Sequence, residues 1–540
     1  MATLPRNHIL FWVLTLLSIA VLWYVPFYPS ADGMAHTYMA TLIKALITGN
    51  DPFYTRYYAL TIEPIPNMLS QYILAAINLV FSPFATEKIF VSGLIILHMV
   101  ALRRFFSLLS SGHAISDYLP FLFVFAYPFI HGNFNYTLSI SLALLLAEFW
   151  LRSSGRWTLP RAAGLVCGVC VLYFAHLFGL ALWCGIVGLH GFFEACLNCR
   201  HKRSLRPTII NLAVFAASMA VPLICVYYYV HLPKLQSGLF QPTPDAAPRE
   251  ILYGVSFLSY RLDGIMVAQL IEIACLIGAA LALYSASKRG FSSLQLTMLT
   301  LAAGFLTLLF FGPTQLLGGW MMEPRYAHCF WICLLAFISM QPLIPFPKKI
   351  SCGLAVMLFL LILWRGWGML SVQPLLEEIQ GANAYIKPHN TLYTISINEN
   401  KTAFDEIAAP RIATLSPLAA YGAYFSTQHS LIWLDSYQTR ERNIFPVHIL
   451  PTIDPLDHLT ARFIRNVGDT DSYQNMDFRL YNKTAAIPIH YIAVWGKKKY
   501  IEYDSTRTGY ARITAQLQRD YRPIYTSPHE LLTLWELKTP

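Results

Sequence analysis

Long apolar runs recur through the first 371 residues of the chain, separated by short polar loops. A run of about 20 apolar residues is long enough to cross a bilayer as a helix. The runs occupy residues 8–25, 87–105, 117–131, 135–151, 161–177, 179–197, 207–230, 264–287, 293–312, 326–345 and 349–371. This pattern predicts an all-α polytopic membrane bundle of about eleven transmembrane helices.

The loops between the runs carry much of the positive charge, which indicates how the bundle is oriented. The basic groups are Arg103–Arg104, Arg152–Arg161, Arg200–Arg206, Lys288–Arg289 and Lys348–Lys349. Because cytoplasmic loops carry the excess of arginine and lysine, these groups predict a cytoplasmic N-terminus and an outer C-terminus. A further apolar run occupies residues 65–82. If it crossed the membrane, the basic loops would face outward, so we expect it to be a helix lying in or dipping into the outer leaflet.

Composition agrees with a membrane protein and excludes other classes. The 540 residues are 56% hydrophobic and only 13% charged, and the mean hydropathy is +0.47. A net charge of +10 would suggest nucleic acid in a soluble chain, but here much of it lies in the basic loops, so we expect no nucleic-acid partner. All ten cysteines precede residue 353, so the polar tail has no disulfide framework.

From about residue 372 the sequence becomes mixed polar and aromatic, with no further spanning run. Residues 375–386 have a helical pattern, and 391–397, 490–495 and 531–537 have the patterns of strands. We therefore predict two domains: a transmembrane domain over 1–371 and a soluble, extracytoplasmic α/β domain over 372–540.

Between the first two spans lies a long polar loop, predicted to extend over 27–86. Within it, residues 35–48 repeat apolar side chains at helical spacing, and Gly49 is a suitable helix stop. This helix either lies flat on the membrane or packs on the bundle.

Asp32 and His36 in this loop are the first candidates for chemistry. Their spacing of four places both on one helix face if the helix starts at or before Asp32. Asp32 is then either a general base, with its pKa raised near the bilayer, or simply the N-cap of the helix. Further polar residues of the loop are candidates for substrate binding: Asp51, Arg56, Tyr57 and Glu63.

Other outer turns carry polar residues that could line the same cavity. They are His131, Asn133 and Asn135 at the start of the fourth span, His176 at the end of the fifth, and Glu323, Arg325 and Tyr326 at the start of the tenth. Arg325 either anchors to lipid headgroups or holds a phosphate through its guanidinium fork. Arg365 in the last span is expected to snorkel toward the membrane surface. Nucleotide-binding and hydrolase motifs are missing from the sequence.

This order of features resembles the GT-C class of polytopic membrane glycosyltransferases. Asp32-x-x-x-His36 is similar to the first outer loop of uncharacterised bacterial members, and Pro324-Arg325-Tyr326 is similar to an arginine-bearing motif before a late span. The resemblance covers residues 5–371 and implies an inverting transfer from a polyprenyl-phosphate sugar at the outer face of the bacterial inner (plasma) membrane. It implies Asp32 as base and Arg325 as partner of the lipid phosphate.

The resemblance leaves several points open. The acceptor is a glycan, a lipid or a protein, and a divalent metal ion is optional because only some members of the class use one. A transporter or flippase for a lipid-linked substrate would use the same polar cavity, as would a non-catalytic GT-C-like scaffold.

Overall fold

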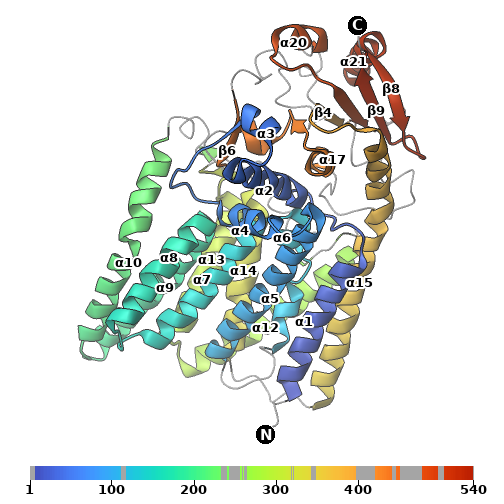
Figure 1. The fold of residues 1–540 in the computed structure, drawn as a ribbon. Coiled ribbons are helices and arrows are strands. Elements are labelled where there is room, and N and C mark those ends of the chain that lie inside the picture. Colours follow the sequence, from blue (N-terminus) through green and yellow to red (C-terminus); the bar gives the residue numbers. More distant parts are fainter. Residues whose placement is uncertain are drawn as a thin grey trace. The chain divides into compact units, whose positions relative to one another are not determined.

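The computed structural model of the chain describes residues 6–110, 117–232, 240–241, 256–257, 260, 264–317, 319, 321–341, 348–396, 420–440, 445–450, 477–496 and 504–538. Contacts between residues divide the chain into two compact units. The first, called the bundle unit, comprises Met1–Tyr24, Pro64–Ser70 and Val91–Trp367. The second, called the sheet unit, comprises Val25–Glu63, Gln71–Phe90 and Gly368–Pro540. Figure 1 labels the elements of both units.

Long helices build the bundle unit. They are α1 (Arg6–Tyr24), α7 (Phe134–Ser153), α8 (Leu159–Ala175), α9 (Leu177–Arg200), α10 (Arg206–Val230), α12 (Ile265–Arg289), α13 (Ser293–Phe311) and α14 (Met322–Ser339). Helices α5 (Pro83–Leu109) and α15 (Lys348–Gln380) have residues in both units. Among the described residues, seven helices are long and apolar enough to cross a membrane, and two shorter apolar helices lie at His8–Tyr24 and Leu159–Ala175. The predicted helical membrane bundle is confirmed.

The predicted span at 117–131 is wrong as a helix. The segment contains a 3₁₀ turn, η2 (Leu119–Leu122), and a single short helix, α6 (Tyr127–His131). A proline opens each of these pieces, and proline has no backbone N–H to continue a preceding helix. Between them Phe125 has φ of 52°, which interrupts helical geometry. The apolar composition of the run therefore reflects burial of irregular backbone.

Arg365 satisfies the carbonyls of this irregular backbone. Its side chain is fully buried and donates to the carbonyl oxygens of Leu122 at 3.0 Å, Phe257 at 2.7 Å and Phe121 at 3.4 Å, and also to that of Val124. Irregular backbone inside an apolar bundle needs such partners. The expectation that Arg365 snorkels is thus wrong, because its guanidinium lies inside the protein.

Polar side chains set the junctions between helices. Ser292 opens α13 with a capping box, in which its Oγ accepts from the Gln295 amide and the Gln295 side chain accepts from the Ser292 amide. His176 separates α8 from α9, and its Nδ1 accepts from the Phe178 amide at 3.0 Å. The break at His176 is therefore fixed by its own side chain.

The C-terminal part of the sheet unit is an α/β structure. Its five-stranded sheet has the order β5 (Ile432–Trp433), β4 (Thr391–Ser396), β7 (Tyr491–Trp495), β9 (Leu532–Leu537) and β8 (Tyr521–Thr526). Strands β5, β4 and β7 are parallel, whereas β7, β9 and β8 are antiparallel. The strands predicted at 391–397, 490–495 and 531–537 are confirmed over their described residues, as is the α/β class.

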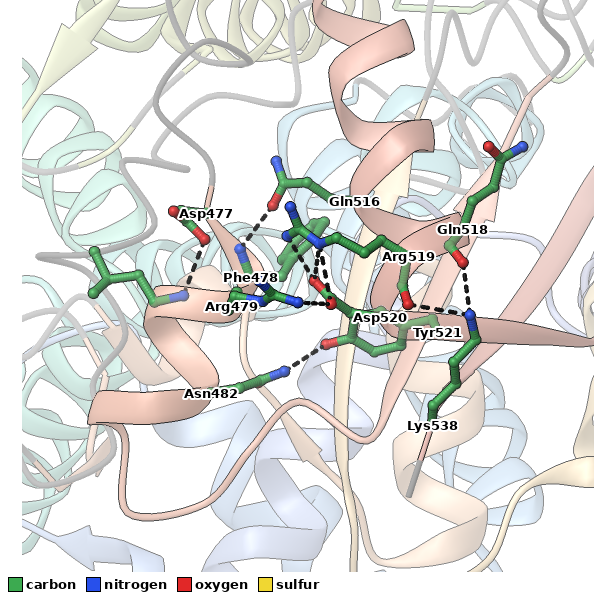
Figure 2. A network of polar contacts seen from close by, with 11 residues as sticks. Asp477, Phe478, Arg479, Asn482, Gln516, Gln518, Arg519, Asp520, Tyr521 and Lys538 are labelled. Carbon is green, nitrogen blue, oxygen red and sulfur yellow. Dashed lines mark hydrogen bonds and ion pairs between the residues drawn. The ribbon is translucent and has the colours of Figure 1, made fainter. Parts of the chain in front are cut away.

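A network of ion pairs joins helices α20 and α21 of the sheet unit. Asp520, at the end of α21 (Asp504–Asp520), accepts from Arg519 at 2.7 Å and from Arg479 of α20 (Phe478–Thr484) at 3.0 Å. Figure 2 shows these contacts together with Lys538, which donates to backbone carbonyls at the end of α21. The arginines lower the pKa of Asp520, with the Arg519 hydrogen bond as the first cause.

Most of the segment predicted as the first outer loop, residues 27–63 and 71–86, belongs to the sheet unit. Strand β1 (Tyr58–Leu60) pairs antiparallel with β6 (Val447–Ile449), and α2 (Gly33–Thr48) packs beside α17 (Tyr421–His429). The predicted helix at 35–48 is confirmed, and Gly49 ends it with φ of 66°. The run 65–82 contains the helix α4 (Leu69–Asn78).

The orientation of the bundle in the membrane and the domain boundary at residue 371 stay predictions.

Buried tyrosines hold the loop against the C-terminal part of the same unit. Tyr38 on α2 donates to the Leu431 carbonyl at 2.8 Å and lies 2.9 Å from the hydroxyl of Tyr58. Tyr54, in α3 (Pro52–Tyr57), donates to the same carbonyl at 3.3 Å. Burial raises the pKa of both Tyr38 and Tyr54, so both hydroxyls remain protonated donors.

Candidate active site

Asp32 occupies the N-cap position of α2 without using its side chain as a cap. The Gly33 amide instead donates to Ser30 Oγ at 3.1 Å, and the Asp32 carboxylate makes no capping hydrogen bond. The Asp32 carbonyl accepts from the His36 amide at 3.0 Å, so the two residues are one helical turn apart. The side chain is half-buried. Ser30 therefore caps the first amide of α2 in place of the Asp32 side chain.

Two amide side chains fix the ring of His36, which is 7% exposed. Gln71 Nε2 and Gln438 Nε2 both lie 3.1 Å from Nδ1 of His36. An amide NH₂ only donates, so Nδ1 is the accepting nitrogen and Nε2 carries the hydrogen. His36 is thus held as a neutral ring that can donate through Nε2.

The segment that leads to Asp32 is held at several points. Phe27 exchanges two hydrogen bonds with the Gln373 side chain, at 3.0 Å through its amide and 2.9 Å through its carbonyl. Ser30 Oγ contacts Glu87 Oε1 at 3.4 Å, and Lys88 donates to the Val25 carbonyl. Such fixed supports hold the backbone that leads to Asp32 in one position.

The remaining predicted residues of the loop lie in and beyond α3. Asp51 caps this helix, accepting from the amides of Phe53 at 3.0 Å and Tyr54 at 3.4 Å. Arg56 is exposed and lies 5.4 Å over the ring of Tyr57, while Glu63 is half-buried. Asp51 therefore has a structural role here, and the substrate-binding roles of these four residues stay predictions.

In the bundle unit, the predicted residue Arg325 lies beside Tyr136. Its Cζ is 5.6 Å from the centre of the Tyr136 ring, and its carbonyl accepts from the Tyr136 hydroxyl at 3.2 Å. The guanidinium contacts Met322 Sδ at 3.5 Å, while its buried Nε has no hydrogen-bond partner. Within the part of the chain that the structure describes, no carboxylate pairs with this cation.

Tyr136 also brings other predicted residues together. The ring of His176 lies 6.1 Å from the Tyr136 ring, edge to face. His131 Nε2 lies 3.2 Å from Sδ of Met321, the residue before α14. Glu323 and Tyr326, within the first five residues of α14, are both buried. Arg325 and His176 thus surround one aromatic ring, and His131 lies against the start of the helix that carries Arg325.

The two predicted asparagines serve the backbone. Asn135 accepts from the Ser70 amide at 2.7 Å and donates to the Asn67 carbonyl at 2.9 Å, which fixes residues 67–70 within the bundle unit. Asn133 precedes α7, and its carbonyl accepts from the Thr137 amide at 2.9 Å. Their roles in substrate binding stay predictions.

The candidate residues therefore form two groups. Asp32 and His36 belong to the sheet unit, whereas Arg325, His176 and His131 belong to the bundle unit. The first group offers an acceptor of protons and a hydrogen-bond donor, and the second offers a cation for an anionic ligand. Among the described residues there is no group of three or more His, Cys, Asp or Glu that could hold a metal ion.

Comparison with known proteins gives little further information. No family model matches the chain, and no curated protein matches it. Among solved structures, it is similar to the crystal structure of ArnT from Cupriavidus metallidurans bound to undecaprenyl phosphate. The identity is 11%, the match covers 98% of this chain and 97% of that one, and the TM-score is 0.39.

Several residues of the site were not predicted. Ser30, Gln71 and Gln438 fix the Asp32 and His36 group, and Tyr136 supports Arg325. Glu87 and Lys88 had a local signal, because two adjacent charges at the start of an apolar run are unusual. Gln438 had none, since its partner His36 is 402 residues away in the chain.

Proposed function

We propose that the chain is an integral membrane glycosyltransferase that moves a sugar from a polyprenyl-phosphate carrier to an acceptor at the outer face of a bacterial inner membrane. The observation that carries this proposal is the place of Asp32 at the start of α2, where Ser30 is the cap and a histidine held by two amides lies one turn further on. The GT-C resemblance of the sequence supports the same assignment.

In the proposed reaction, Asp32 takes the proton of the acceptor hydroxyl. The acceptor oxygen attacks the anomeric carbon, the bond from that carbon to the phosphate oxygen breaks, and the configuration inverts. The bonding pair leaves with the polyprenyl phosphate, whose charge Arg325 neutralises. Positioning of both substrates against fixed groups supplies the remaining acceleration. Inside an apolar bundle, a cation that pairs with no carboxylate among the described residues suits an anionic ligand.

The test uses the full-length protein in lipid nanodiscs with undecaprenyl-phosphate-linked radiolabelled pentoses and hexoses, and a bacterial envelope lipid extract as acceptor source. We expect labelled product and released undecaprenyl phosphate from the wild type. Asp32→Asn should lower the rate at least about 100-fold, because its amide is not a base. The matched control is Asp477→Asn, which alters an aspartate that does cap a helix, α20, in the same unit.

Two results would contradict the proposal. Equal product from wild type and Asp32→Asn would remove Asp32 as base. Movement of the labelled donor across the membrane of proteoliposomes, without release of undecaprenyl phosphate, would favour a transporter or flippase instead.

A further inference from the structure

The hydroxyl of Tyr136 lies at the centre of a buried polar contact between α7 and α14. It is 3.2 Å from the Arg325 carbonyl, 2.9 Å from Nδ1 of His328 and 3.6 Å from Sγ of Cys329. Tyr136 is 1% exposed and His328 is fully buried. A buried hydroxyl with such partners fixes the local position of the helix that it contacts.

The face of the Tyr136 ring supports the side chain of the same arginine. The distance of 5.6 Å from Cζ to the ring centre is within the ~6 Å range of a cation–π contact. Among the described residues, the hydrogen bond of the Arg325 side chain is to Met322 Sδ, a weak acceptor, at 3.5 Å. Tyr136 thus contacts both the backbone and the guanidinium of Arg325.

Tyr136 has a single hydroxyl proton, which decides the direction of its hydrogen bond with His328. When Tyr136 donates to the Arg325 carbonyl, His328 must donate from Nδ1 to the Tyr136 oxygen. The ring of His328 is held by Phe123, with centroids 5.2 Å apart, and by His98 at 6.0 Å. Packing therefore keeps the His328 donor in place beside Tyr136.

We propose that Tyr136 is a positioning residue that holds the guanidinium of Arg325 in the orientation that receives the phosphate of the lipid carrier. The role of Arg325 as phosphate partner rests on the proposed function. The position of the guanidinium is a separate property, which can be measured without any transfer reaction.

The first measurement is binding of undecaprenyl phosphate to the full-length protein in nanodiscs, in a double-mutant cycle of Tyr136→Phe and Arg325→Ala. Tyr136→Phe keeps the ring and removes the hydroxyl. We expect it to weaken binding about fivefold in the wild-type background and to have no further effect when Arg325 is already alanine. Tyr173→Phe is the matched control, since it removes a buried hydroxyl that donates to the Pro64 carbonyl at 2.7 Å.

The second measurement is the rate at which phenylglyoxal modifies Arg325, followed by mass spectrometry with Arg289 as internal reference. We expect Tyr136→Phe to change this rate severalfold at Arg325 and not at Arg289, and Tyr173→Phe to change neither.

The outcomes separate the two proposals. Binding that falls by the same factor in both backgrounds, or does not fall at all while Arg325→Ala weakens it, would overturn the positioning role. If Arg325→Ala binds the lipid like the wild type, the phosphate role of Arg325 is lost. In that case the modification rate decides: a changed rate at Arg325 supports positioning by Tyr136, and an unchanged rate overturns it.

Discussion

Gln438 donates a hydrogen bond to Nδ1 of His36 over 3.1 Å, although 402 positions separate the two residues in the chain. Gln71 donates to the same nitrogen from α4. Three segments of the sheet unit thus meet at one imidazole. This arrangement fixes the tautomer of a residue that the sequence shows only as the fourth position after Asp32.

Replacement of Gln438 by leucine tests whether the tautomer matters. Leucine removes one of the two donors at similar volume and leaves Gln71 as the single donor to Nδ1, so we expect the rate of sugar transfer to fall about tenfold while the protein stays folded. The transfer assay, read at saturating donor, measures the change. Gln428→Leu is the control, because Gln428 also donates through Nε2, to Gln380 at 2.9 Å, but is exposed. A similar loss in both variants would contradict a specific role of the His36 contact.

Substitution of Ser30 should lower the stability of the protein, whereas substitution of Asp32 should lower its activity and leave its stability nearly unchanged. Ser30→Ala leaves the Gly33 amide without its partner, and we expect a loss of about 1 kcal/mol in the free energy of unfolding. Asp32→Asn should leave stability nearly unchanged, because its side chain does not cap α2. Thermal unfolding of both purified variants measures the difference. A larger destabilisation by Asp32→Asn than by Ser30→Ala would return Asp32 to a capping role.

Local signals in the sequence were sufficient for most elements. The helical repeat of 35–48 and the stop at Gly49 predicted α2, alternation predicted β4, and the strand pattern of 490–495 predicted β7. These elements depend on neighbours along the chain. The run 117–131 was misread because apolar composition indicates burial, which irregular backbone can share with a helix. The burial of Arg365 was not predicted because its partners are backbone carbonyls, which carry no sequence signal.

In the candidate site too, residues with a local sequence signal were predicted and residues brought together by tertiary packing were not. Asp32 and His36 were predicted from their spacing, and Arg325 from its place before an apolar run. The groups that orient them, Gln438 and Tyr136, are distant in sequence, and glutamine or tyrosine residues are common enough that neither stands out. Which polar residues meet is decided by tertiary packing.

Arg365 should be essential for the folded bundle unit. Arg365→Met removes the donors to the carbonyls of Phe121, Leu122 and Phe257, and buried groups left unpaired cost about 1–3 kcal/mol each. We expect little monodisperse protein after extraction in detergent, as measured by size-exclusion chromatography. Arg365→Lys should recover part of it, since an ammonium has three donors but no planar fork. Arg289→Met, at an exposed arginine at the end of α12, should behave like wild type. Equal yields for Arg365→Met and Arg289→Met would contradict the role of the buried guanidinium.

Asp520 should give the sheet unit a dependence on pH that is confined to acid. Its pKa lies below the ordinary value of 3.8, so the folded state favours the charged carboxylate. The stability from this ion pair is therefore present above pH 3.8 and is lost as the pH falls below that value. Because both arginines are about half exposed, we expect Asp520→Asn to cost only about 0.5–1 kcal/mol at pH 7.

Hydrogen exchange in β8 (Figure 2 shows its first residue, Tyr521) measures this effect. Wild type and Asp520→Asn are compared at the same pH, so the intrinsic exchange rates cancel. We expect β8 to exchange faster in the variant at pH 7 and equally fast in both proteins well below pH 3.8. Lys538→Met is the control, because it removes hydrogen bonds of a lysine to the carbonyls of Gln518 and Arg519. Its effect should be the same at both pH values, and a loss of that effect in acid would show that the pH dependence does not come from Asp520.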